Sequence, residues 1–149
     1  MRLFFILALL FSPPAWAAGN YSYTPDAGKM LNEAKQLIQK EKYKRAIGKL
    51  EKAMRDEPEN ADIYNYLGFA YRKSGNYEAS GSHYQKALFL DPNHKLALEY
   101  QGELFLTLND IASAEANLER LADLCPKGCG ERDDLAKAIE QHRNAQGAK

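Results

Sequence analysis

The chain has 149 residues, enough for one domain with a hydrophobic core and too few for two domains of ordinary size. It carries 20 basic and 20 acidic residues, so its formal net charge at pH 7 is zero. This balance argues against the strongly basic surface with which nucleic-acid-binding proteins neutralise phosphates. We therefore expect no nucleic-acid partner.

The segment 1–17 has the organisation of a secretory signal peptide. Arg2 precedes an apolar run over 3–11, then two prolines and the small residues Ala15 and Ala17. The run is about half of the roughly 20 apolar residues that a membrane-spanning helix needs. We expect cleavage after Ala17, or alternatively after Ala18, and no membrane insertion of the mature protein. The periplasm is the expected location and secretion is the alternative; residues 18–26 form a lead segment.

A regular period organises the rest of the chain. Pro58, Pro92 and Pro126 are evenly spaced along it. The same interval relates two sets of small residues and one set of bulky residues, namely Ala34, Gly68 and Gly102; Ala46, Ser80 and Ala114; and Leu50, Tyr84 and Leu118. This register predicts three equivalent units over 27–60, 61–94 and 95–128.

Each unit has the apolar spacing of two antiparallel helices. In the middle unit, apolar residues recur at helical intervals from Tyr64 to Tyr71 and again from Tyr84, on either side of a turn at 74–76. Gly68 is expected where the two helices approach closely, with Tyr84 filling the space beside it and Pro92 ending the second helix. Residues 131–144 have the spacing of a further, closing helix.

These residues resemble the tetratricopeptide repeat, whose pattern runs Leu-Gly, aromatic, Ala, aromatic, Ala, Pro. The middle unit matches it closely, and the third unit departs at Leu121, where Ala is usual, which predicts looser or rearranged packing there. The resemblance implies an all-α, right-handed solenoid of three helix-turn-helix repeats, with a capping helix and tail over 129–149. It does not imply one particular function, because such repeats serve many processes.

The resemblance also implies that the first helix of each pair lines a concave groove. The residues that it places in this groove as partner-binding candidates are Leu31, Lys35, Asn65, Tyr66, Phe69, Arg72, Leu96, Tyr100 and Glu103. Tyr66 and Phe69 stand out because other residues already account for the buried face of their helix. We expect an extended peptide or a helix to bind there, oriented by Asn65 and Arg72. The alternative is that neighbouring repeats or the lead segment cover the two aromatic rings.

One subgroup of the family holds the C-terminal carboxylate of chaperones with Lys, Asn and Arg side chains. The corresponding positions in this chain are Leu31, Lys35, Tyr66, Leu96 and Tyr100. Only Lys35 keeps a charge, so this carboxylate clamp is not expected here.

Cys125 and Cys129 are the only cysteines and flank a Pro-Lys-Gly turn. In an exported protein such a pair is expected to form a disulfide, which stabilises by about 2 kcal/mol in the chain-entropy model. The alternative is a redox-active pair, but thioredoxin-type motifs have two intervening residues on a βαβ unit. Here Pro126, Lys127 and Gly128 intervene, in a helical context.

The sequence predicts no enzyme, cofactor or metal site. His83, His94 and His142 lack ligand spacing, and surface or boundary roles are expected for His83 and His94. Carboxylate pairs such as Glu99 with Glu103 are expected to form solvated helix faces. Nucleophile elbows, phosphate-binding glycine loops and dinucleotide motifs are absent. The chain is therefore interpreted as a non-enzymatic module that binds a protein or peptide, with self-association into a homo-oligomer as a further alternative.

Overall fold

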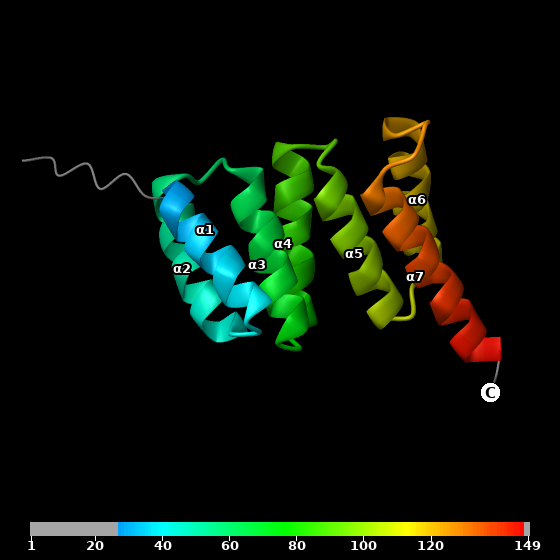
Figure 1. Cartoon of the computed structure of the whole chain (residues 1–149), viewed down its shortest axis with the longest axis horizontal. Coiled ribbons are helices and arrows are strands. Elements are labelled where there is room, and N and C mark those ends of the chain that lie inside the picture. Colours follow the sequence, from blue (N-terminus) through cyan, green and yellow to red (C-terminus); the bar gives the residue numbers. More distant parts are fainter. Residues whose placement is uncertain (1–26, 148–149) are drawn as a thin grey trace, which may run out of the picture.

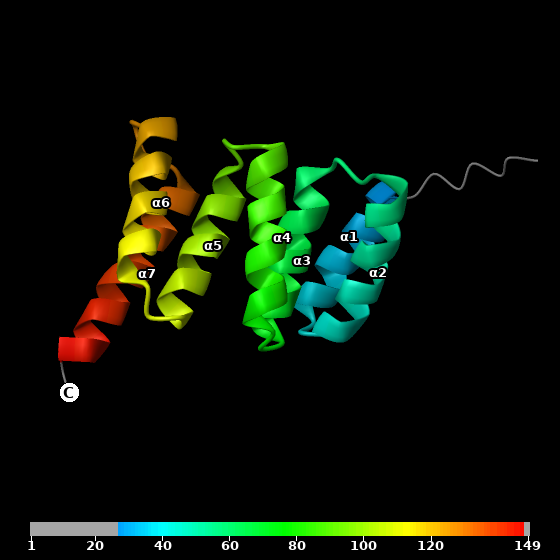
Figure 2. The ribbon, with the colours of Figure 1, turned by 180° about the vertical axis from the view of Figure 1, so that it is seen from behind.

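A computed structural model describes residues 27–147; the expected signal peptide over 1–17 and the lead segment over 18–26 lie outside this range. Within it the chain forms seven α-helices and no strands. They are α1 (Ala27–Gln39), α2 (Tyr43–Asp56), α3 (Ala61–Lys73), α4 (Tyr77–Leu90), α5 (Lys95–Thr107), α6 (Ile111–Leu124) and α7 (Gly130–Gly147). Figure 1 shows the helix pairs following one another in chain order, with α7 beside α5 and α6, and Figure 2 shows the same arrangement from behind. The expected all-α repeat fold is confirmed.

The helices are arranged as successive antiparallel pairs. α1 packs on α2, α3 on α4 and α5 on α6, and the first helices begin at Ala27, Ala61 and Lys95, at the same interval as the prolines. The first helices also touch one another, because α1 contacts α3, α3 contacts α5, and α5 contacts α7. We call α1, α3, α5 and α7 the inner row.

The turn inside each pair is built at the same place in every repeat. Glu41, Gly75 and Asn109 have φ angles of 56°, 84° and 61°, in the left-handed region. A residue in this conformation ends a helix and lets the chain reverse. The expected turn at 74–76 is therefore one of three equivalent turns.

Side chains that cap the helices recur at the same interval. The second helices α4 and α6 begin after Asn76 and Asp110, whose side-chain oxygens accept hydrogen bonds from the backbone N–H groups of Ala79 and Ser113, both at 3.1 Å. Such bonds satisfy backbone donors that have no partner within the helix. The helix starts are thus set locally.

Small residues let the two helices of the middle repeat approach closely. A Cβ atom added at Gly68 would lie 2.6 Å from ring carbons of Tyr84, which is itself fully buried. Ser80 reinforces this approach, because its hydroxyl donates to the Gly68 carbonyl oxygen over 2.8 Å. The expected close contact between Gly68 and the second helix is present, and it leaves no room even for a methyl group.

The third repeat packs differently. The space beside Gly102 is filled by Leu135 of α7, whose side chain would lie 2.6 Å from an added Cβ. α6 buries Leu121 and also Asn117, whose amide donates to the Leu98 carbonyl and to the Gln101 side chain, both at 3.0 Å. The packing expected to change at Leu121 is thus rearranged around α7, which covers α5 and α6.

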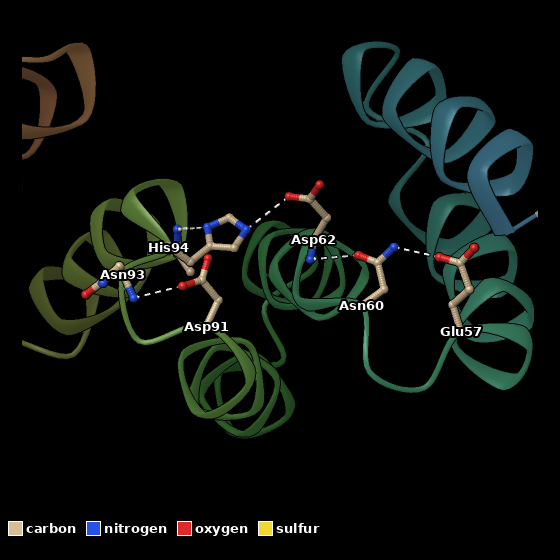
Figure 3. A network of polar contacts seen from close by, with 7 residues as sticks. Glu57, Asn60, Asp62, Asp91, Asn93 and His94 are labelled. Atoms are coloured by element: carbon tan, nitrogen blue, oxygen red, sulfur yellow. Dashed lines mark hydrogen bonds and ion pairs between the residues drawn. The ribbon is translucent and has the colours of Figure 1, made fainter.

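A polar network links the N-terminal ends of α3 and α5, the first helices of the second and third repeats (Figure 3). Asn60 caps α3 by accepting from the Asp62 backbone N–H at 3.1 Å, and its own amide donates to Glu57 at 2.7 Å. His94 caps α5, because its Nδ1 accepts from the Ala97 backbone N–H at 3.2 Å. Its Nε2 therefore carries the proton in the neutral ring and donates to Asp62 at 3.0 Å. His94 has a capping role and joins repeats two and three.

None of the helices within 27–147 combines the length and apolar character that crossing a bilayer requires.

We predict that Gly68→Ala destabilises the fold although Ala favours helices. Helix propensity gains about 1 kcal/mol, but displacing the buried Tyr84 ring costs about 1–3 kcal/mol as overpacking. A net loss of about 1 kcal/mol in the free energy of unfolding should appear in urea titrations followed by circular dichroism. Gly48→Ala is the control, since a Cβ there meets nothing within 4 Å, and it should stabilise by about 0.5–1 kcal/mol. Equal responses of the two variants would contradict the packing described.

We also predict that His94→Ala lowers the free energy of unfolding by about 1 kcal/mol, because α5 loses its cap. Asp62→Ala should cost less, since it removes one exposed contact. A double-mutant cycle should show coupling of about 0.5 kcal/mol or more between the two positions. Strict additivity would show that the link between repeats drawn in Figure 3 does not form.

Candidate functional site

Most of the predicted partner-binding residues lie partly exposed on the inner row. They are Lys35 from α1, Tyr66, Phe69 and Arg72 from α3, and Leu96, Tyr100 and Glu103 from α5. We call this set the inner face. That they bind a partner stays a prediction, but the structure brings them together on three adjoining helices.

Aromatic side chains connect the helices across this face. The rings of Phe69 and Tyr100 lie 4.8 Å apart at their centroids with a 49° tilt, joining α3 to α5. The Lys35 ammonium lies 4.7 Å from the centre of the Tyr66 ring, joining α1 to α3. Burial, together with the carboxylate of Glu99, raises the pKa of Tyr100 to about 12, so its hydroxyl stays protonated at neutral pH. We call Tyr66, Phe69 and Tyr100 the aromatic strip.

Arg72 sits beside the aromatic strip and is already paired. Its Nη2 forms an ion pair with the Glu103 carboxylate on α5, and its guanidinium carbon lies 5.4 Å from the centre of the Phe69 ring. The Arg72 side chain is only 10 % exposed, and its Nε has no hydrogen-bond partner among the described residues. Arg72 therefore holds α3 and α5 together, in addition to the partner-orienting role expected of it.

Two of the predicted partner-binding residues are not on the open face. Leu31 is 7 % exposed and packs in one core cluster with Ile63 and Leu67 of α3, and Asn65 is completely buried. Leu31 and Asn65 are one repeat period apart, so they occupy the same position of successive repeats. The prediction that they face an open groove is wrong, because this position is turned into the packed interior.

Glu99 is the third residue at this position, and it is also buried, with 7 % of its surface exposed. Burial raises the pKa of Glu99 to about 7, and the carboxylates of Glu103, Asp134 and Glu131 act in the same direction, while Arg72 opposes them. The expectation that Glu99 and Glu103 form a solvated pair is therefore wrong for Glu99. The repeat period places Glu99 at the same position as Leu31 and Asn65, but it carries no sign that this position is buried.

The two cysteines connect α6 to α7. The structure pairs the sulfur atoms of Cys125 and Cys129, whose Cα atoms are 5.8 Å apart, and Cys125 is 6 % exposed. Arg132 of α7 donates to the Cys125 carbonyl oxygen at 3.2 Å. This turn sets where α7 begins and hence how α7 lies against α5.

The histidines take part in structural contacts. The His83 ring stacks on Tyr71 with centroids 5.3 Å apart and a 7° tilt, and burial lowers its pKa. His142 lies 3.1 Å from the Asn109 side chain. In the part of the chain that the structure describes, no group of three or more His, Cys, Asp or Glu side chains is arranged to hold a metal ion.

Comparison with known proteins shows which family has this architecture. A family model described as tetratricopeptide repeat matches residues 31–95 and 70–128. The probable biofilm formation methyltransferase WspC of Pseudomonas putida is 29 % identical over 96 residues, which cover 64 % of this chain and 23 % of that protein. The chain thus spans about a quarter of the length of that relative.

Solved structures show the same fold. The tetratricopeptide repeat domain of Sgt2 from Aspergillus fumigatus superposes with a TM-score of 0.73 at 21 % identity, covering 83 % of this chain and 81 % of that one. The first such domain of Spaghetti (RPAP3), bound to the HSP90 peptide SRMEEVD, gives 0.68 at 23 % identity, covering 77 % and 90 %. Because the family model covers well over half of its length, the chain belongs to the tetratricopeptide repeat family.

Proposed function

We propose that this protein is a non-enzymatic interaction module that binds a segment of a partner protein across its inner face. The observation that carries the proposal is the aromatic strip. Tyr66, Phe69 and Tyr100 remain partly exposed, although other side chains already fill the core beside them. A contiguous patch of partly exposed aromatic rings on packed helices is typical of a protein interaction site.

The chemistry of the aromatic strip suits a peptide or a helix. Aromatic side chains bury a large area for few rotatable bonds, and they dominate the binding energy of protein interfaces. The contact between Phe69 and Tyr100 holds both rings in place before a partner arrives. A surface arranged in this way loses less conformational entropy on binding.

The similar structures support peptide binding as a mode of action for this fold. The RPAP3 domain is solved with an HSP90 peptide of sequence SRMEEVD bound to it. In this chain the positions of the carboxylate clamp carry Leu31, Tyr66, Leu96 and Tyr100 beside the single cation Lys35. We therefore propose a different partner, one held mainly by apolar contacts.

The proposed place of action is the periplasm, after removal of residues 1–17. The support for this is the sequence of that segment and the pair of cysteines, which an oxidising compartment would keep joined. In this proposal the disulfide has a structural task, because it holds α7 against α5 next to the inner face.

We predict that the exported protein contains no free thiol. Alkylation followed by mass spectrometry should add no label before reduction and two labels after reduction. Replacing both cysteines by serine should lower the free energy of unfolding by about 2 kcal/mol. Two labels without a reductant, or a serine variant of unchanged stability, would contradict the structural role and favour the redox alternative.

We predict that the double variant Tyr66→Ala, Phe69→Ala loses its partner. The processed protein, purified by affinity from its native envelope, should recover at least about tenfold less partner than the wild type, because aromatic anchors carry most of the binding energy. Phe89→Ala is the matched control, since Phe89 is 77 % exposed on α4, outside the inner face. Circular dichroism should show the same helix content for all three proteins.

The Phe89→Ala control shows whether the partner binds the inner face or the second helices. Loss of the same partner in Phe89→Ala would place binding on the second helices. Full recovery by a folded double variant would refute the proposal.

A further inference from the structure

One position of the repeat changes from apolar to polar to charged along the chain. Leu31, Asn65 and Glu99 follow one another at the repeat period and are all buried, with 7 %, 0 % and 7 % of their surfaces exposed. Leu31 shows that an apolar side chain fills this position well in the first repeat. The packing of the fold therefore does not require polar groups at the other two positions.

These polar groups are costly where they are. Neither the nitrogen nor the oxygen of the Asn65 amide has a hydrogen-bond partner in the described structure. Glu99 likewise has no hydrogen bond or ion pair within residues 27–147, but its carboxyl oxygens are not fully enclosed, so a group from outside the fold can reach them. An unpaired buried amide costs about 1–3 kcal/mol, and a charge costs more. Side chains kept at such a cost point to a role outside folding.

The surroundings of Glu99 are negatively charged. The carboxylates that act on Glu99 are Glu103 from α5 and Glu131 and Asp134 from α7. Arg72 of α3 opposes them but is already paired with Glu103. We call Glu99, Glu103, Glu131 and Asp134 the acidic junction. Its charge calls for a cation, and in the described residues its side chains are not arranged as a metal-binding group.

The acidic junction adjoins the aromatic strip. Glu99 precedes Tyr100 in the chain, and the Tyr100 ring touches Phe69. Glu103 pairs with Arg72, which lies against the same Phe69 ring. A partner segment on the aromatic strip would thus reach the acidic junction within a short stretch of its own chain.

We propose that the acidic junction binds a lysine or arginine side chain of the partner segment, next to the apolar side chains that the aromatic strip holds. This inference rests on the proposed function and names the chemistry of the partner. Ammonium and guanidinium groups supply several N–H donors to carboxylates, and charge-assisted hydrogen bonds of this kind are among the strongest in proteins. The basic side chain provides the partner that Glu99 lacks.

Binding of this kind depends on pH. Burial raises the pKa of Glu99 to about 7, so in the free protein the carboxyl is largely protonated below that pH. A bound cation favours the ionised form, so binding releases a proton and the affinity falls as the pH drops through 7. Charged or titratable groups face Glu99 from three helices. They are Glu103 and Tyr100 from α5 itself, Arg72 from α3, and Glu131 and Asp134 from α7.

The test uses the processed protein and a library of short peptides with acetylated and amidated ends. Each pool fixes one residue type at one position, and bound peptides are identified by sequencing. We expect enrichment of Lys or Arg beside an aromatic or leucine residue, and depletion of Asp and Glu. The best peptide and a version with Gln in place of its basic residue are then each titrated into the protein by calorimetry. The Gln version should bind at least about tenfold more weakly.

Variants of the acidic junction test whether it causes the preference for Lys or Arg. Glu99→Gln should weaken the basic peptide by at least about fivefold and change the Gln version less than about twofold. Asp134→Asn, an exposed change on α7, should weaken the basic peptide about twofold. Glu119→Gln, exposed on α6, is the control and should have no effect. Wild-type affinity for the basic peptide should fall about tenfold from pH 8 to pH 6, and Glu99→Gln should remove most of this fall.

The outcomes separate this inference from the proposed function. Peptides that need Tyr66 and Phe69 but show no preference for Lys or Arg, or keep their affinity in folded Glu99→Gln, overturn the inference and leave the proposed function in place. The inference also fails if the carboxyl ¹³C shift of Glu99 titrates identically with and without the basic peptide. If no peptide binds, or binding ignores the double aromatic variant, both fail together.

Discussion

The two helices of the middle repeat pack closely because small residues stand where they meet. Gly68 leaves room for the Tyr84 ring only because it lacks a Cβ, and Ser80 adds a hydrogen bond to the same backbone. With the pairs held at this distance, the inner row of helices comes into direct contact, and side chains from α1, α3 and α5 form one surface. A bulkier side chain at Gly68 would push α3, which carries Tyr66 and Phe69, away from α4.

The chemistry of the inner face changes from one end to the other. At α1 and α3 it consists of a lysine over a tyrosine ring, and at α5 and α7 it consists of carboxylates around a buried glutamate. Between them, Arg72 and Phe69 connect α3 to α5 through an ion pair and an aromatic contact. A partner segment would therefore meet apolar and acidic groups in a fixed order, which favours binding in one direction along the row.

The period of the sequence was sufficient to predict the helix pairs, the turn at Gly75 and the small residues of the interior, because each follows from local spacing. It was not sufficient at Leu31, Asn65 and Glu99, because spacing along the chain does not show how the inner helices pack on one another. The contact of Leu135 with Gly102 could not be predicted either, since it depends on the orientation of α7. The sequence period specifies contacts within a repeat but does not specify contacts between repeats.

The most direct test of the account is site-specific photo-crosslinking in the native cell. A photoreactive phenylalanine analogue at position 69 lies on the inner face, and the same analogue at position 89 lies on the exposed surface of α4. Because the proposed binding site is the inner face, illumination should join a partner protein to position 69 and not to position 89. Crosslinks from position 89 alone, or equal crosslinks from both positions, would contradict it.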